Sequence, residues 1–339
     1  MNCTPDNRTP PAAGAPALEA IRETPCHVLT GFLGSGKTTL LRHVLEHGLD
    51  GRRVAVLMNE IGDIGIDGRS VDVLDGIGSM VELNSGCVCC TIDISEFTDA
   101  YHAIVSRIAP DLVIIETTGV ALPEPILDRL EGVAADCDAV ITVVDAENYD
   151  ACAQREPALE RQVLAADFIV VNKSDLATTP ALEALESRLR RLNPRAAVLR
   201  CEQGRAPVDV LFAPDAHRLR LAVSSRVAQH DPRPHQHDIQ AFSYASDAPV
   251  DTARFLDVVR RLPPAILRAK GILVPTTGAP LLFNLVCGRL GVERRPTLRG
   301  RARASEAVFI GYGVDALRSS IVDALQRCGP DAEPVDIER

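Results

Sequence analysis

The sequence has no tryptophan, and aromatic residues make up only 4% of its 339 positions. A core of ordinary size must therefore be packed mainly from aliphatic side chains. No stretch approaches the roughly 18 consecutive apolar residues of a membrane-spanning helix. Residues 1–23 are rich in proline and alanine and lack the apolar segment of a signal peptide. We therefore expect a cytoplasmic protein without a membrane partner.

A surplus of basic residues is also lacking, because 46 Asp and Glu residues outnumber 36 Lys and Arg residues and give a formal net charge of −10. Nucleic acids attract a positively charged surface, so a nucleic-acid partner is not expected. The ten cysteines do not indicate a disulfide framework, since they are spread over a long chain and three fall within four positions. Reduced thiols and a bound metal explain them better.

One stretch matches a nucleotide-binding motif at every required position. Residues 27–41 read His-Val-Leu-Thr-Gly-Phe-Leu-Gly-Ser-Gly-Lys-Thr-Thr-Leu-Leu, which places the P-loop pattern G-x-x-x-x-G-K-[ST] between a predicted strand and a helix start. Glycines let the loop turn its N–H groups onto phosphate oxygens, where a Cβ would block the approach. Lys37 is expected to reach the β- and γ-phosphates and Thr38 to place its hydroxyl on Mg²⁺. The predicted phosphate-binding residues are Gly31, Gly34, Ser35, Gly36, Lys37 and Thr38.

Strand-like and helix-like segments alternate after the P-loop, which predicts an α/β fold. Its form should be an open, mostly parallel, doubly wound sheet with helices on both faces, typical of a P-loop NTPase domain. Residues 230–238 are polar and broken by prolines, so a second, small α+β domain should begin after them. The predicted division is a disordered lead-in at 1–24, a P-loop NTPase domain at 25–228, a His/Pro linker at 229–238, a C-terminal domain at 239–330 and a tail at 331–339.

A second motif concerns the base of the nucleotide. Asn172-Lys173-Ser174-Asp175 follows a predicted strand and matches the N-K-x-D element by which P-loop GTPases recognise guanine. The Asp175 carboxylate can accept hydrogen bonds from the guanine N1–H and exocyclic amine, whereas adenine has an acceptor at N1 and would leave it unpaired. The motifs together predict GTP as the nucleotide. A small-molecule kinase uses the same P-loop but is disfavoured, because no second substrate site is evident.

Glu116 and Gly119 form the pattern E-x-x-G at the end of a predicted strand. The carboxylate of Glu116 is expected to hold Mg²⁺, directly or through water, and the Gly119 N–H to sense the γ-phosphate. An ordinary surface turn is the alternative. The candidate catalytic residues are thus Lys37, Thr38, Glu116 and Gly119. Because no certain general base or arginine finger is visible, intrinsic turnover should be slow.

Cys87, Cys89 and Cys90 follow a glycine within four positions. This spacing is too tight for the paired knuckles of a four-ligand structural zinc site, but three thiolates can hold a soft ion and leave one position open for transfer. The alternative is that the cysteines fill a core as small apolar side chains. A second cluster, His230, His235 and His237, is either an auxiliary metal loop or a solvated linker.

In chain order, the motifs at residues 31–41, 59–67 (Asn-Glu-Ile-Gly-Asp-Ile-Gly-Ile-Asp), 86–90 (Gly-Cys-Val-Cys-Cys), 116–119 and 172–175 resemble the CobW-type metallochaperone GTPases, which include activators of nitrile hydratase. Residues 267–271 and 308–311 resemble that family's C-terminal domain, so the resemblance spans about residues 26–330. It implies GTP hydrolysis coupled to the insertion of a metal, commonly zinc, with cobalt, nickel or iron in some branches. Asp63 stands where the family pattern has Glu, and the His-rich tract is short.

The resemblance also implies roles for individual residues. Thr39 would join the phosphate and Mg²⁺ site. Glu60 and Glu116 would serve the metal–nucleotide switch and hold Mg²⁺, directly or through water, and the three thiolates would hold the cargo metal. The partner would be a client metalloprotein, and a homodimer is left open. Two alternatives remain for the function: a metal-buffering or sensory protein whose affinity is set by GTP without delivery, and cobalt insertion that supports cobalamin synthesis or nitrile hydratase activation.

Overall fold

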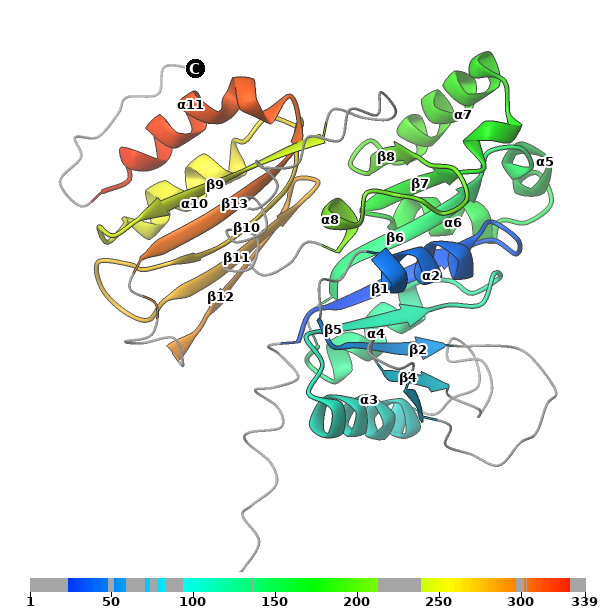
Figure 1. Ribbon diagram of the computed structural model, residues 1–339, viewed down its shortest axis with the longest axis horizontal. Coiled ribbons are helices and arrows are strands. Elements are labelled where there is room, and N and C mark those ends of the chain that lie inside the picture. The colour runs from blue at the N-terminus through cyan, green and yellow to red at the C-terminus, as the bar shows by residue number, and fades with distance from the viewer. Residues whose placement is uncertain are drawn as a thin grey trace, which may run out of the picture.

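The computed structural model describes residues 24–47, 52–58, 71–73, 79–82, 94–135, 137–212, 239–296, 302 and 304–329. The predicted lead-in up to residue 23, the segment 59–67, the thiols at 87–90, the histidines at 230–237 and the tail lie outside these residues. Figure 1 shows two β-sheets side by side, each with its own helices. No described helix has the length and apolar character needed to cross a membrane.

The first sheet has eight strands in the order β3-β4-β2-β5-β1-β6-β7-β8. All neighbours are parallel except β3 and β4, which are antiparallel. The predicted mostly parallel, doubly wound sheet is therefore confirmed. Its strands are β1 (Cys26–Gly31), β2 (Val54–Met58), β3 (Val71–Val73), β4 (Ser79–Glu82), β5 (Leu112–Glu116), β6 (Cys137–Asp145), β7 (Phe168–Asn172) and β8 (Ala197–Arg200).

Helices cover both faces of this sheet, because successive side chains of its central strands point to opposite sides. On β1, Leu29 packs in a cluster with Leu40 and Val44 of α2, whereas Val28 packs on the other face with Phe97 of α3. The helices of this unit are α2 (Lys37–His47), α3 (Ile94–Ile108), α4 (Glu124–Gly132), α5 (Tyr149–Ala153), α6 (Ala158–Ala165), the 3₁₀ helix η1 (Ser174–Leu176), α7 (Thr179–Leu192) and α8 (Val208–Leu211).

The second unit is an antiparallel sheet of five strands in the order β12-β11-β10-β13-β9, with two helices on one face (Figure 1). The predicted α+β domain is confirmed, although the strands β10, β11 and β12 were not expected from the sequence. The elements are β9 (Ile239–Ser246), α10 (Thr252–Arg260), β10 (Ile266–Leu273), β11 (Leu281–Val286), β12 (Arg289–Arg294), β13 (Ser305–Tyr312) and α11 (Val314–Gln326).

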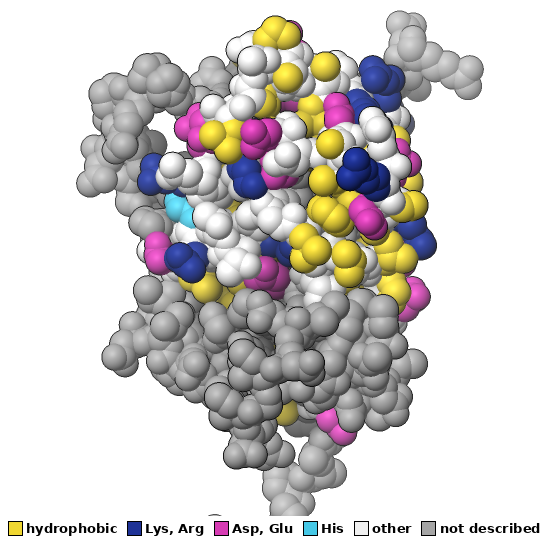
Figure 2. Space-filling view, turned by 90° about the vertical axis from the view of Figure 1, so that its right-hand side faces the viewer, with side chains coloured by type: hydrophobic (Ala, Val, Ile, Leu, Met, Phe, Trp, Pro, Cys, Tyr) yellow, Lys and Arg dark blue, Asp and Glu magenta, His cyan; other side chains and the backbone are white. Residues whose placement is uncertain are grey.

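The two units share one hydrophobic cluster. Leu267 and Ile310 of the second sheet pack with Leu211 and Phe212, which follow the first sheet. The contact between the two units lies at the amino ends of β1, β6 and β7. The carboxyl ends of these strands, at the opposite end of the sheet, are therefore left for a site. On the face of the molecule shown in Figure 2, acidic and basic side chains of the described residues are interspersed.

Candidate functional site

The loop between β1 and α2 depends on glycine at two positions. Gly31 and Gly36 have φ angles of +139° and +102°. A Cβ on Gly31 would lie 2.3 Å from the Val143 carbonyl oxygen, and one on Gly36 would lie 2.2 Å from Asn172 Nδ2. Neither position can hold a side chain without displacing a neighbouring strand or its side chain. The neighbours are β6 and β7, so the sheet itself shapes the loop.

Lys37, the first residue of α2, carries its ammonium group into this loop. Its Nζ donates hydrogen bonds to the carbonyl oxygens of Gly31, at 2.8 Å, and Phe32, at 3.2 Å. Burial lowers the pKa of Lys37, and the nearby Glu116 carboxylate acts in the opposite direction. A buried cation at the N-terminus of a helix, inside a glycine-rich loop, forms a concave site for phosphate oxygens.

Thr38 and Glu116 meet beside Lys37. The Thr38 hydroxyl donates a hydrogen bond of 2.8 Å to Glu116 Oε1. Glu116 is the last residue of β5 and pairs in register with Leu29 of β1, which explains how residues 78 positions apart come together. A hydroxyl and a carboxylate are hard oxygen ligands, which suit Mg²⁺. The pair therefore fits the metal expected beside the phosphates.

The segment after Glu116 packs directly on the P-loop. The Thr117 hydroxyl donates to the Thr30 hydroxyl at 3.0 Å, and the Thr117 N–H donates to the Leu29 carbonyl at 2.9 Å. A Cβ on Gly119 would lie 2.5 Å from the backbone nitrogen of Leu33, so only glycine allows this approach. The turn that is expected to sense the γ-phosphate is thus in contact with the loop that is expected to bind it.

Asn172, the first residue of the N-K-x-D element, connects two loops. Its Nδ2 donates to the Ser35 carbonyl at 2.9 Å, and its Oδ1 accepts from the Gly204 N–H at 2.9 Å. The side chain is buried, so these bonds are shielded from water. Asn172 therefore holds the P-loop against the segment that follows β8.

The other residues of this element lie in a tight turn. Lys173 has φ of +61°, and its Nζ lies 2.7 Å from Asp145 Oδ2 at the end of β6. Burial alone would raise the pKa of Asp145, but hydrogen bonds from Lys173 and Asn148 leave it below its ordinary value. The Ser174 hydroxyl donates to the Cys201 carbonyl at 3.0 Å, and Asp175 is exposed. This leaves the Asp175 carboxylate open to a base.

The structure therefore brings the P-loop, Glu116–Gly119 and Asn172–Asp175 to one edge of the sheet. Thr39, on α2, is exposed at the same edge. Glu60, Cys87, Cys89 and Cys90 lie outside the described residues, so their roles stay predictions. Within the part of the chain that the structure describes, no three His, Cys, Asp or Glu residues form a group that could hold a metal ion.

The described cysteines are free thiols rather than disulfides. Burial raises the pKa of Cys201 and of Cys287 to about 12. Such groups remain protonated near neutral pH and are poor metal ligands, since the thiolate is the ligand form. Cys201 and Cys287 therefore fit a structural role better than a metal site.

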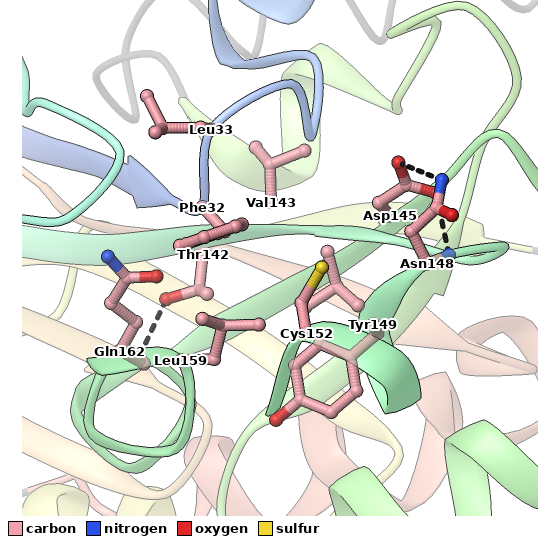
Figure 3. A pocket seen from close by; sticks show the side chains of 11 residues that line it. Phe32, Leu33, Thr142, Val143, Asp145, Asn148, Tyr149, Cys152, Leu159 and Gln162 are labelled. Carbon is pink, nitrogen blue, oxygen red and sulfur yellow. Dashed lines mark hydrogen bonds between the residues drawn. The ribbon is translucent and has the colours of Figure 1, made fainter. Parts of the chain in front are cut away.

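One residue of the site was not found from the sequence. Gln162 of α6 is buried, and its Nε2 donates to the carbonyl oxygens of Gly119, at 3.2 Å, and Ala121, at 2.9 Å. Figure 3 shows it together with Phe32 and Leu33 among the residues that line a small pocket next to the P-loop. The only local signal was a polar residue on the apolar side of a helix.

Comparison with known proteins places these features in a family. The model of the CobW/HypB/UreG nucleotide-binding domain matches residues 25–200, and the model of the cobalamin synthesis protein CobW C-terminal domain matches residues 239–329. The chain is 32% identical over 340 residues to the zinc chaperone CobW of Pseudomonas aeruginosa, covering 88% of this chain and 90% of the relative.

Two further relatives have similar identity. The zinc chaperone CobW of a Sinorhizobium species is 30% identical over 332 residues, covering 85% of this chain and 92% of the relative. The zinc chaperone YjiA of Escherichia coli is 33% identical over 261 residues, covering 73% and 80%. As its motifs predicted, the chain belongs to the CobW/HypB/UreG family of nucleotide-binding proteins.

Proposed function

We propose that this protein is a GTPase that binds zinc and delivers it to a client metalloprotein in the cytoplasm. The observation that carries the GTPase part is the Thr38 hydroxyl 2.8 Å from the Glu116 carboxylate, next to the buried ammonium group of Lys37. The zinc part is supported by the three thiols at 87–90 and by relatives named zinc chaperones. The client and a homodimeric assembly belong to the same proposal.

The residues of the P-loop edge would act on GTP in distinct ways. Thr38 and Glu116 would hold Mg²⁺, which supplies neutralisation of the charge on the β- and γ-phosphate oxygens. Lys37 would exchange its carbonyl partners for those oxygens, and the loop N–H groups would fix the phosphate chain in place. Gly119, packed against Leu33, would present its N–H to the γ-phosphate and so distinguish GTP from GDP.

Nucleotide selectivity tests the GTPase part. GTP should be hydrolysed much faster than ATP. Lys37→Ala should abolish turnover, and its circular dichroism spectrum should show that the protein is still folded. Asp175→Asn should move the preference toward xanthine nucleotide, whose C2 carbonyl needs a donor. Equal rates for GTP and ATP in the unaltered protein would show that the guanine assignment is wrong.

Delivery is separated from buffering by a transfer assay. Zinc-loaded protein is mixed with the apo form of a zinc-dependent enzyme, in the presence of a chelator that traps any zinc released to solution. Activation of the enzyme with Mg-GTP, and none without nucleotide, supports direct delivery. The buffering alternative is supported if all zinc passes to the chelator both with Mg-GTP and without nucleotide. This result must hold for every zinc enzyme of the same cell that is tried. Cobalt loading in the same assay tests the cobalt-insertion alternative.

A further inference from the structure

The turn that follows Glu116 is fixed from one side by its own backbone. The Ala121 N–H donates to the Thr118 carbonyl at 3.1 Å, which closes a four-residue turn with Gly119 and Val120 at its centre. This bond fixes the peptide plane before Gly119. The Gly119 N–H belongs to that plane, so its direction is set.

Gln162 fixes the turn from the other side. Its side-chain amide donates to the Gly119 carbonyl at 3.2 Å and to the Ala121 carbonyl at 2.9 Å. The first bond sets the peptide plane after Gly119, so both planes that flank this glycine are held. Gln162 is 1% exposed, and water therefore cannot replace these bonds if the amide is removed.

Gln162 is itself held in place by the sheet. The Thr142 hydroxyl, on β6, donates to the Gln162 backbone carbonyl at 2.8 Å, as the dashed line in Figure 3 shows. The neighbouring Arg161 pairs with Glu124 at 2.9 Å, but this pair is about half exposed and contributes little. The buried amide is thus the contact by which α6 determines where the turn lies.

The position of the turn has little tolerance on the side of the P-loop. A Cβ on Gly119 would lie 2.5 Å from the Leu33 nitrogen, so the two backbones are already in close contact. A small shift of the turn moves its N–H relative to the third phosphate. Among the hydrogen bonds of the described residues, none joins the Gln162 side chain to the P-loop or to Lys37, which would hold the β-phosphate that GTP and GDP share.

From these contacts we infer that Gln162 is a positioning residue for the γ-phosphate, which makes the affinity for GTP, but not for GDP, depend on α6. This inference rests on the proposed GTPase function. A residue that only stabilised the fold would affect both nucleotides equally. The ratio of the two affinities therefore separates the two roles.

The test compares Gln162→Leu, which keeps the volume and removes both donors, with Arg161→Ala, which breaks the adjacent exposed ion pair. Affinities for a non-hydrolysable GTP analogue and for GDP are measured by calorimetry with Mg²⁺ on the full chain. Gln162→Leu should lower the affinity for the analogue by about tenfold or more and the affinity for GDP by less than about twofold. Arg161→Ala should change neither affinity. The rate constant of GTP hydrolysis should fall with the analogue affinity.

Equal weakening of both nucleotides, or no change in either, would overturn the inference. If Gln162→Leu does not fold, Gln162→Asn, whose amide is one methylene shorter, takes its place with the same expected ratio. Failure of the unaltered protein to bind the GTP analogue would instead contradict the proposed function, so the two failures are distinguishable.

Discussion

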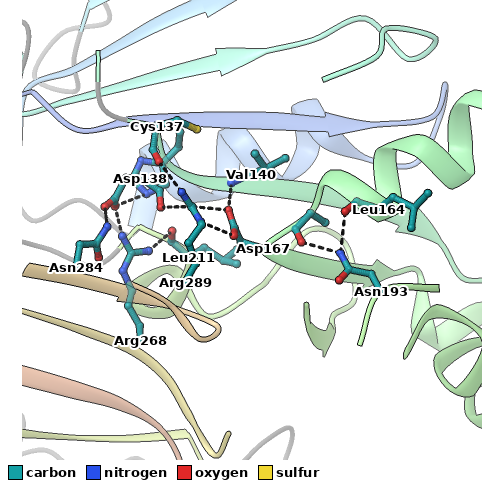
Figure 4. Close-up of polar contacts among 12 residues, drawn as sticks. Cys137, Asp138, Val140, Leu164, Asp167, Asn193, Leu211, Arg268, Asn284 and Arg289 are labelled. Carbon is teal, nitrogen blue, oxygen red and sulfur yellow. Dashed lines mark hydrogen bonds and ion pairs between the residues drawn. The ribbon is translucent and has the colours of Figure 1, made fainter. Parts of the chain in front are cut away.

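Arg268 of β10 and Asp138 of β6 form an ion pair across the contact between the two domains, and both side chains are buried (Figure 4). Arg268 also donates to the Leu211 carbonyl at 3.0 Å, and Asn284 of β11 donates to Asp138. Burial alone would raise the pKa of Asp138, but Arg268 and Lys270 hold it well below its usual range. The second sheet is therefore attached at the amino ends of the strands of the first sheet, and the nucleotide site lies at their carboxyl ends.

Removing one partner of this pair should be strongly destabilising. Arg268→Met leaves the buried Asp138 carboxylate without its ion-pair partner, and Lys270, 3.9 Å away, offsets the charge only in part, so the free energy of unfolding should fall by about 3–5 kcal/mol. The double variant Arg268→Met with Asp138→Asn removes both charges and should recover part of this loss. Urea unfolding of the single and double variants measures the coupling. Equal stability of Arg268→Met and the double variant would show that the unpaired charge is not the cause.

His27 makes the same contact sensitive to pH. Burial lowers the pKa of His27 from 6.5, and Asp138, 3.1 Å away, opposes this effect only in part; Arg268 and Lys270 lower the pKa further. The unfolded state therefore binds a proton more readily than the folded state. Stability is fully present above about pH 6.5 and is lost as the pH falls through the lowered pKa.

Urea midpoints at about pH 7.5 and about pH 5.5 should therefore differ more in the unaltered protein than in His27→Gln. The matched control is His102→Gln, which replaces another histidine of the first domain that is not at the contact. A loss of pH dependence in His102→Gln but not in His27→Gln would contradict this explanation.

The sequence predicts the elements whose signal is local. The P-loop is recognised from its glycines, and strands such as Leu112–Glu116 from a short run of aliphatic residues, so each needs only a few neighbouring positions. β10 does not, because Arg268 and Gly271 interrupt its apolar pattern, and the group that neutralises Arg268 lies 130 positions earlier. The partners of Gln162 are likewise on a distant segment, at 119 and 121. The sequence therefore did not reveal the buried polar residues whose partners lie far away along the chain.

Two glycines of the P-loop should respond differently to alanine. Gly34 and Gly36 both have positive φ angles, of +73° and +102°, but only at Gly36 does a Cβ meet a neighbour, Asn172 Nδ2. Without nucleotide, Gly34→Ala should cost about 1–2 kcal/mol of stability from its backbone alone. Gly36→Ala should cost more, because it also disrupts the hydrogen bond from Asn172 to Ser35.

Urea unfolding of both variants, in the unaltered background and with Asn172→Ala, measures this difference. The excess loss at Gly36 should shrink when the amide is absent, since the group that the Cβ contacts has been removed. An excess of the same size in both backgrounds would mean that the contact with Asn172 does not shape the loop.

The last prediction concerns coupling between metal and nucleotide, and it rests on order along the chain. The thiols at 87, 89 and 90 lie between the acidic segment at 59–67 and the turn at 116–119. Both neighbours are expected to respond to the γ-phosphate, so zinc affinity should differ between the GTP and GDP states. Linkage requires that zinc change the affinity for GTP by the same factor, for which about 5- to 150-fold is typical.

Zinc titrations of protein loaded with a non-hydrolysable GTP analogue, and again with GDP, measure this factor. Cys89→Ser should weaken zinc binding and remove the effect of zinc on GTP affinity, while GTP binding itself stays nearly intact, since no cysteine is expected to touch phosphate. Cys152→Ser, which alters a half-buried thiol of α5 outside the Cys-Val-Cys-Cys motif, should leave the coupling unchanged. Identical zinc affinities in the two nucleotide states would make Cys87–Cys90 a static site and favour buffering over delivery.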